Sequence, residues 1–135
     1  ILGRAFLDTN VLVSATLTPG VCRTLRAEAR HRRFEAVISP AVLEEFQQAL
    51  RRLGALPETI GEAVQVVRGV CEVTDAQPAR VPEGFGMADR RLVGQAIAAG
   101  AEFFVTGDKE ILERAADLPV KIVSPRAFLE LLTKR

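Results

Sequence analysis

The sequence predicts an α/β fold in which a parallel sheet is covered by helices on both faces. Short apolar runs alternate with helical segments along the chain, as in successive βαβ units. Two of these runs, which end at Leu7 and Val105, are followed closely by the aspartates Asp8 and Asp108. Open parallel sheets bind their ligands beyond the C-terminal ends of the strands. We therefore expect the two aspartates to meet at one edge of the sheet if their strands are neighbours.

Apolar periodicity and the Pro and Gly residues that interrupt it define the individual elements. The expected strands are 4–8, 34–38, 71–74, 102–105 and 120–123. The expected helices are a short one at 10–15, then 21–33, 40–53, 57–70 and 88–99, one just after Asp108, and 125–132. The helix at 40–53 has the clearest boundaries, since Ser39-Pro40 is a typical helix start and Gly54 a typical end. Residues 78–86 form the one long irregular connection, and such loops are often functional.

Length and composition indicate one ordinary domain, which we expect to span residues 1–135. The chain is 48% hydrophobic and 26% charged, and its net charge of +1 gives no strongly basic surface. Bulk charge therefore does not argue for nucleic-acid binding. Cys22 and Cys71 belong to no metal or redox motif, which is typical of reduced thiols in a cytoplasmic protein. We expect a cytoplasmic protein without a membrane segment.

Two further acids lie near buried helix faces when residues are placed at about 100° intervals. Glu45 lies roughly 100° from the centre of the apolar face of its helix, at the border of the buried side, whereas Glu44 faces water. Asp89 lies within about 30° of the centre of the apolar face of the helix at 88–99, in its first turn. Glu45 therefore borders the buried side of its helix, and Asp89 occupies a core-directed position in its own.

Each of the four acids also has an ordinary structural explanation. Asp89 and Asp108 are well placed to cap helices, and Glu45 fits a boundary position. Four carboxylates gathered at one sheet edge, however, would repel one another. A hard divalent cation such as Mg²⁺ or Mn²⁺ would relieve this repulsion, because it binds carboxylate oxygens and keeps waters for chemistry.

Taken together, four motifs resemble those of the PIN-domain ribonucleases, in particular the VapC-like toxins of bacterial toxin–antitoxin pairs. The motifs are Asp8-Thr9-Asn10, Glu45 in the helix opened by Ser39-Pro40, Asp89 with small and apolar residues through Ala96, and Val105-Thr106-Gly107-Asp108. The resemblance covers residues 4–132. It implies a three-layer sandwich whose central parallel sheet has about five strands in the order 3-2-1-4-5.

The resemblance also implies a site and an activity. The catalytic and metal-binding acids of the family correspond to Asp8, Glu45, Asp89 and Asp108, and its supporting polar residues to Asn10 and Thr106. The implied reaction is hydrolysis of phosphodiester bonds in single-stranded RNA with Mg²⁺ or Mn²⁺. The implied partners are an antitoxin protein and a second copy of the chain in a homodimer.

The chain departs from the family at one place. Relatives usually carry a run of aspartates just before the third acid, where this sequence has Glu83-Gly84-Phe85-Gly86-Met87. Asp89 is thus the only aspartate there, and weaker metal affinity or a changed substrate preference would follow from the missing acids.

Two other functions remain open. A magnesium-dependent phosphotransfer domain, either a receiver or a phosphatase-like one, also uses an aspartate at a strand end. A phosphatase of that kind has a second aspartate where this chain has Asn10, and a receiver has a lysine at the end of its last strand, whereas Lys121 lies inside it. The second alternative is a catalytically degenerate PIN domain that only binds a partner.

The sequence also leaves open which basic residues would contact RNA. Arginines 23, 26, 90 and 91 are candidates for the RNA backbone, but arginine is equally common on solvated helix faces.

Overall fold

The computed structural model describes residues 2–75, 77–81, 86–114 and 118–134, with the backbone alone for residues 87 and 88. The strands are β1 (Arg4–Leu7), β2 (Glu35–Ile38), β3 (Cys71–Val73), β4 (Phe103–Val105) and β5 (Lys121–Val123). The helices are α1 (Thr9–Leu17), α2 (Val21–Arg30), α3 (Pro40–Arg52), α4 (Pro57–Val70), α5 (Met87–Ala98), α6 (Lys109–Glu113) and α7 (Pro125–Thr133). Residues 83–85, where the chain departs from the PIN toxins, lie outside the described part.

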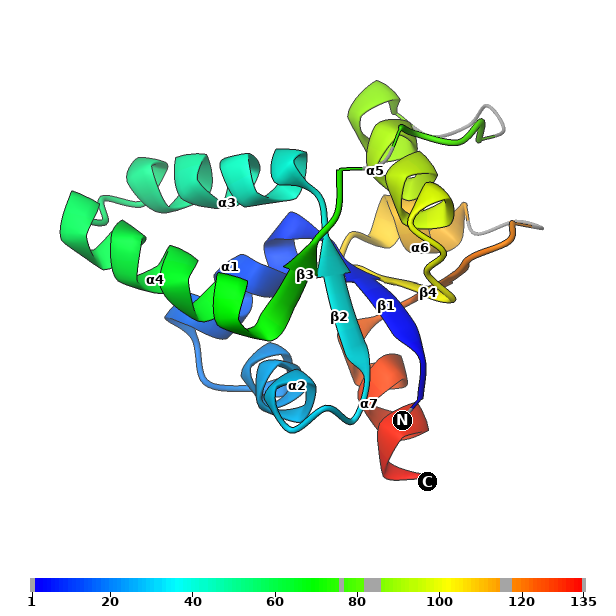
Figure 1. Cartoon of the computed structure of the whole chain (residues 1–135), viewed down its shortest axis with the longest axis horizontal. Coiled ribbons are helices and arrows are strands. Elements are labelled where there is room, and N and C mark those ends of the chain that lie inside the picture. Colours follow the sequence, from blue (N-terminus) through cyan, green and yellow to red (C-terminus); the bar gives the residue numbers. More distant parts are fainter. Residues whose placement is uncertain (1, 76, 82–85, 115–117, 135) are drawn as a thin grey trace.

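The five strands form one parallel sheet in the order β3-β2-β1-β4-β5, which confirms the expected fold. From β1 the chain moves outward to β2 and β3, and it then returns to β4 on the other side of β1. Because such crossovers are right-handed, this reversal places α1–α4 on one face and α5 and α6 on the other, as Figure 1 shows. The strand order thus changes direction between β1 and β4, where open sheets of this kind bind ligands.

The core is built on β1 and β4 and on the fully buried phenylalanines Phe6, Phe34, Phe46, Phe104 and Phe128. Phe6 of β1 and Phe104 of β4 are register partners, and their rings stack with centroids 5.6 Å apart. On α7, Phe128 packs edge-on against Phe34, at 4.9 Å, and against Phe103, at 5.2 Å. Central strands buried on both faces explain why their sequences are continuously apolar rather than alternating.

The first helix is longer than expected, because both of its ends are held by side chains. The Asp8 carboxylate accepts a hydrogen bond from the backbone N–H of Thr9 at its start. Arg23 donates to the carbonyls of Ala15 and Thr16 at its end, at 2.9 and 3.1 Å. The helix therefore begins directly at the strand-end aspartate.

The second helix ends at Arg30 rather than at residue 33. Arg32 adopts a left-handed conformation (φ 58°), and the N–H of Arg33 then bonds back to the carbonyl of Glu28. This is the C-terminal motif that glycine usually provides, as Gly54 does after α3 (φ 88°). A non-glycine residue at this position is uncommon, so the sequence alone favours a longer helix.

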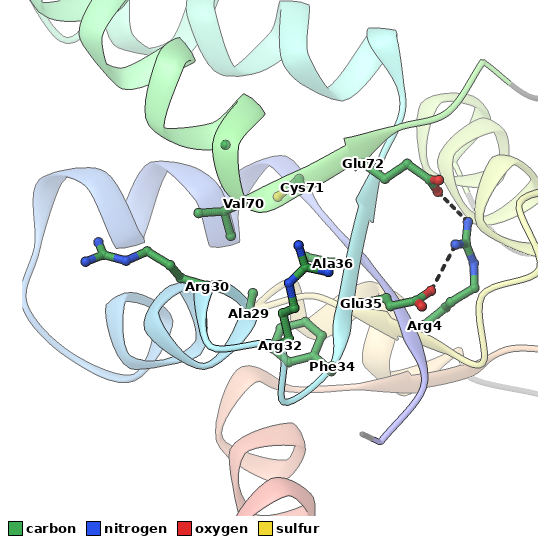
Figure 2. A pocket seen from close by; sticks show the side chains of 11 residues that line it. Arg4, Ala29, Arg30, Arg32, Phe34, Glu35, Ala36, Val70, Cys71 and Glu72 are labelled. Atoms are coloured by element: carbon green, nitrogen blue, oxygen red, sulfur yellow. Dashed lines mark hydrogen bonds and ion pairs between the residues drawn. The ribbon is translucent and has the colours of Figure 1, made fainter.

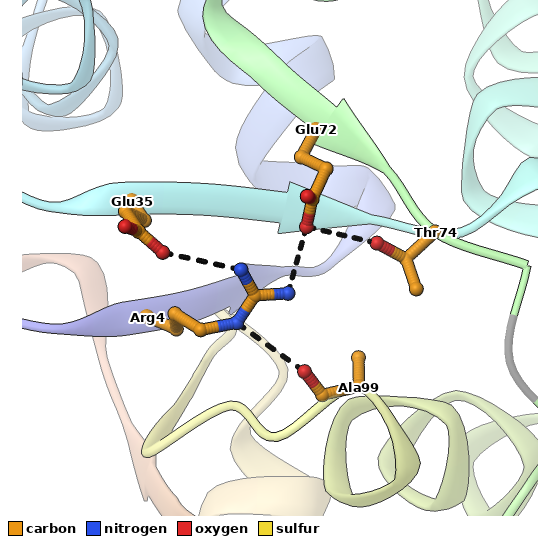
Figure 3. A network of polar contacts seen from close by, with 5 residues as sticks. All are labelled: Arg4, Glu35, Glu72, Thr74 and Ala99. Atoms are coloured by element: carbon orange, nitrogen blue, oxygen red, sulfur yellow. Dashed lines mark hydrogen bonds and ion pairs between the residues drawn. The ribbon is translucent and has the colours of Figure 1, made fainter.

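At the N-terminal end of the sheet, Arg4 ties three strands to α5 (Figure 3). Its guanidinium donates to Glu35 on β2 at 3.1 Å, to Glu72 on β3 at 2.7 Å, and to the carbonyl of Ala99 at 3.3 Å. Ala99 is the C-cap of α5, so this network fixes one end of that helix while Asp89 lies at the other.

Among the described residues, every helix is too short or too polar to cross a membrane.

Candidate functional site

Asp8, Glu45, Asp89 and Asp108 all line one cavity of about 520 Å³, together with Asn10. We call this the acidic cavity. It lies beyond the C-terminal ends of β1 and β4 and is bordered by α1, α3, α5 and the start of α6. Acids separated by as many as 100 residues meet here because the sheet changes direction at this point.

Asp8 is held firmly at the floor of the cavity and is only 7% exposed. Its Oδ1 accepts the N–H of Thr9 at 2.8 Å, and its Oδ2 accepts the hydroxyl of Thr106 at 2.7 Å. A carboxylate oxygen has two lone pairs, so Oδ1, which accepts this single hydrogen bond from Thr9, keeps acceptor capacity for a cation.

Two polar side chains connect the ends of β1 and β4. The Thr106 hydroxyl, which is completely buried, donates to Asp8 and accepts the backbone N–H of Asp108 at 3.1 Å. Asn10 donates weakly to Asp8 Oδ2 at 3.4 Å and accepts the N–H of Gly107 at 3.2 Å. Thr106 and Asn10 therefore fix the position of Asp8 relative to the segment that carries Asp108.

Asp108 serves both as a helix cap and as a wall of the cavity. Its Oδ1 accepts the N–H of Glu110 at 2.9 Å and of Ile111 at 3.5 Å, which caps α6. From the described residues Oδ2 accepts no hydrogen bond. The capping interpretation is therefore correct, and it leaves one oxygen for a ligand.

Glu45 and Asp89 approach from helices on opposite faces of the sheet. Glu45 Oε2 accepts the hydroxyl of Thr9 at 3.0 Å, which joins α3 to α1. Asp89 is half-buried in the first turn of α5, but Gly86 is the N-cap of that helix. The alternative that Asp89 caps its helix is therefore wrong.

Burial and neighbouring charges raise the pKa of two of these acids. For Asp8 the main cause is desolvation; the hydrogen bonds from Thr106 and Thr9 lower the pKa, and the charges of Glu45 and Asp89 raise it. Partial burial also raises the pKa of Asp89, followed by the charges of Asp108 and Glu110, while Arg114 opposes them. The cavity therefore disfavours additional negative charge and would gain from a cation.

The donor set suits a cation of the Mg²⁺ type held by few protein ligands. Among the described residues, no three His, Cys, Asp or Glu side chains lie close enough to bind one ion together. Mg²⁺ usually keeps several waters and binds through only one or two carboxylates. Asp8 and Asp108, each with a free acceptor position, fit that mode, and Glu45 and Asp89 fit contacts through water.

Among the polar residues that line this cavity, sequence reasoning missed Thr9, Ser14, Thr18 and Arg52. Thr9 follows Asp8 directly, and Arg52 lies seven residues after Glu45 on the same side of α3, so both signals are present in the sequence. Arg23, by contrast, is engaged with the end of α1. Of the four arginines considered from the sequence, none lines the cavity.

A second cavity, of about 460 Å³, lies at the opposite end of β2 and β3 (Figure 2). It is lined by Arg30, Arg32 and the buried Cys71, and its acids Glu35 and Glu72 are paired with Arg4. Burial raises the pKa of the Cys71 thiol to about 12, so this sulfur is not a nucleophile at neutral pH. The acidic cavity is therefore the stronger candidate for chemistry.

Comparisons with known proteins agree with this fold. The structure is similar to PAE2754 from Pyrobaculum aerophilum, with a TM-score of 0.68 and 18% identity over 99% of this chain and 92% of that one. It is similar to VapBC2 from Rickettsia felis bound to a DNA fragment from their promoter, with a TM-score of 0.66 and 16% identity over 90% and 98%. It is also similar to the PIN domain endonuclease Utp24, with a TM-score of 0.52 and 17% identity over 90% and 84%.

No curated protein sequence matches the chain significantly. The PIN domain family model, in contrast, matches residues 4–110, which contain all four acids. PIN domains are a nuclease family that includes VapC toxins, and they typically use divalent metals. With this match over most of its length, the chain belongs to the PIN-domain family.

Proposed function

We propose that the chain is a metal-dependent endoribonuclease that hydrolyses phosphodiester bonds of single-stranded RNA. The observation that carries this proposal is the acidic cavity, in which Asp8, Glu45, Asp89 and Asp108 converge at the point where the sheet changes direction. Family membership supports a nuclease, and the choice of single-stranded RNA rests on the resemblance to PIN toxins. The whole chain would act as a single PIN-like domain in the cytoplasm.

The residues of the cavity would divide the work between ion binding and positioning. Asp8 and Asp108 would hold Mg²⁺ or Mn²⁺, and Glu45 and Asp89 would complete the site directly or through water. When bound, the ion would supply a Lewis acid for attack on the phosphodiester and offset the charge on the leaving oxygen. Thr106 would keep Asp8 oriented through its hydroxyl, and Asn10 would hold the start of α1 against Gly107, which follows β4.

The phosphotransfer alternative has less support in the structure. Asn10 is bonded to Asp8 and to the loop after β4, so it is not a second acid of a phosphatase. Lys121 is the first residue of β5 and pairs with Phe103, which places it at the end of the sheet away from the acidic cavity. A receiver-like lysine is therefore not supplied by this strand. The presence of all four acids also argues against a degenerate PIN module, since a protein that only binds a partner has no need of them.

One experiment separates the three functions. The wild-type protein is incubated with a fluorescein-labelled single-stranded RNA in Mg²⁺, in Mn²⁺ and in EDTA, and separately with acetyl phosphate. We expect cleavage with either metal and none in EDTA, with no phosphorylated protein. A phosphorylated protein without cleavage would favour the phosphotransfer domain, and neither signal would favour the binding module. Single-stranded DNA of the same sequence tests the preference for RNA.

We further propose that the protein is the toxin of a toxin–antitoxin pair and forms a homodimer. The similarity to VapBC2 supports this role through the shared fold alone. An antitoxin segment would cover the acidic cavity and offer it a basic side chain. Sedimentation at micromolar concentration tests the dimer, and loss of RNA cleavage on adding the protein encoded by the neighbouring gene tests the antitoxin.

A further inference from the structure

Two cavities adjoin at Asp89. This side chain lines the acidic cavity and also a smaller cavity of about 200 Å³, whose other walls include Gly86, Glu110 and Arg114. We call the smaller one the side cavity. Because the Asp89 carboxylate borders both cavities, a chain-like ligand that lies against Asp89 is placed next to both of them.

Arg52 also lines the acidic cavity, at the C-terminal end of α3. It is in the last turn of α3, seven residues after Glu45, which corresponds to about 10 Å along the helix axis. Its side chain is exposed, and within the described part of the chain it forms no ion pair. Its neighbour Arg51 lines cavities on the other side of the helix, with Gln47.

Arg114 is the arginine that lines the side cavity. It is the C-cap of α6, it is exposed, and its charge acts on Asp89 in opposition to Asp108 and Glu110. Glu110 lines the same cavity, so Arg114 is the cationic group in otherwise acidic surroundings. Each of the two cavities that Asp89 lines thus has one arginine in its described lining.

A polyanion that approaches four carboxylates needs positive charge nearby. Arginine contacts to phosphates position a nucleic acid without reading its sequence, and they account for much of its affinity. The lining of the acidic cavity also includes three apolar residues, Val13 and Leu17 from α1 and Leu92 from α5. Apolar lining suits an unstacked base of a single strand better than the paired bases of a duplex.

We infer that a single RNA strand lies across both cavities, with Arg52 contacting a phosphate on one side of the scissile bond and Arg114 a phosphate on the other. This inference rests on the proposed nuclease function and adds two substrate-positioning residues to it. It also replaces the arginines considered from the sequence, which lie in neither cavity.

The test measures binding and cleavage separately. Binding of a fluorescein-labelled single-stranded RNA is followed by anisotropy in Ca²⁺, over a range of salt concentrations, with the integrity of the RNA checked on a gel. Cleavage is then measured in Mg²⁺ and Mn²⁺. The variants are Arg52→Ala and Arg114→Ala, with Arg52→Lys as the variant that retains the charge. The matched controls are Arg51→Ala, next to Arg52 on the same helix, and Arg68→Ala in the last turn of α4.

We expect each of Arg52→Ala and Arg114→Ala to weaken binding about three- to tenfold and to reduce the slope of log affinity against log salt by about 0.7. Cleavage should change mainly in KM, Arg52→Lys should recover part of the loss, and the melting temperatures should match wild type. If the two arginines only stabilised the fold, their substitution would not change the slope of log affinity against log salt. The two control variants should bind as wild type does.

Other outcomes would overturn one proposal and not the other. The inference would be overturned, and the nuclease left intact, if wild type cleaves RNA while Arg52→Ala and Arg114→Ala bind RNA with unchanged affinity and cleave it with unchanged KM. A loss of RNA affinity in Arg51→Ala equal to that in Arg52→Ala would have the same meaning. Arginine-dependent binding without cleavage in either metal would overturn the nuclease and leave the RNA path intact. No binding of RNA by wild type would overturn the inference.

Discussion

At the scale of single residues, the site depends on one buried hydroxyl. Thr106 gives its proton to Asp8 and accepts the backbone N–H of Asp108, so it fixes both strand-end aspartates at once. Neither bond has water to replace it, because the side chain is fully buried. A buried polar group left without its partner costs roughly 1–3 kcal/mol.

Thr106→Val should therefore destabilise the protein by about 1–3 kcal/mol and reduce metal-dependent cleavage by about 10- to 100-fold. Urea unfolding and the RNA cleavage assay measure the two effects. Thr106→Ser retains the hydroxyl and serves as the control, with activity close to wild type. Equal stability and activity of the valine and serine variants would show that the hydroxyl does not support Asp8.

Asp89 should give the metal-free protein a measurable dependence on pH. Its pKa is raised in the fold, so its stabilising contribution is complete below the pKa of the unfolded chain, about 4, and is lost as pH rises through the folded value. At neutral pH the ionised carboxylate then costs stability, by less than about 1 kcal/mol because it is only half-buried. Asp89→Asn removes this cost.

We therefore expect Asp89→Asn to match wild type in stability near pH 4 and to exceed it increasingly toward pH 7, in the absence of metal. Unfolding free energies measured over this range in EDTA test the prediction. Glu44→Gln, at an exposed position of α3, controls for general charge effects. Parallel pH profiles of wild type and Asp89→Asn would contradict the proposed crowding of carboxylates.

At the scale of elements, strand ends and helix starts build the site together. Asp8 follows β1 and caps α1, and Asp108 comes after β4 and caps α6. Each aspartate thus has a structural function beside its proposed chemical one. Substitutions that separate the two functions are therefore more informative than alanine alone.

Asp108→Asn and Asp108→Ala differ in whether the side chain can still cap α6. Asparagine keeps an oxygen for the N–H groups of Glu110 and Ile111, whereas alanine removes it, at a cost of about 1 kcal/mol. We expect the asparagine variant to be as stable as metal-free wild type, or slightly more stable, and the alanine variant to be less stable. Thermal melts in EDTA measure the difference. A strongly destabilised asparagine variant would show that the aspartate acts chiefly as a cap.

The bounds of the helices and strands also show how much of the fold the sequence predicts. Apolar runs located all five strands, and the caps Ser39 and Gly54 gave the bounds of α3 to within one residue. The end of α2 was misplaced, because the left-handed Arg32 has no glycine to signal it. The length of α1 was underestimated, since its end is held by Arg23 from the next helix, a tertiary contact that local patterns do not contain.

At the scale of the whole molecule, the strand order explains why distant acids meet. The alternation of elements predicts a parallel sheet, but the order 3-2-1-4-5 came from the resemblance and not from any residue pattern. Asp8 and Asp108 were visible in the sequence because Asp8 directly follows an apolar run and Asp108 comes three residues after another. Arg52 is signalled only by its place seven residues after Glu45 on α3, and the relation of Arg114 to the acids exists only once α5 and α6 are packed.

The central claim is that the four acids form one cation-dependent nuclease site. The most direct measurement is the cleavage rate of a labelled single-stranded RNA as Mn²⁺ is titrated, for wild type and Asp108→Asn, with both proteins shown to be folded by thermal melting. We expect a rate that rises and saturates with Mn²⁺ in wild type and falls by at least about 100-fold in the variant. Undiminished cleavage by Asp108→Asn, or wild-type cleavage that persists in EDTA, would contradict the claim.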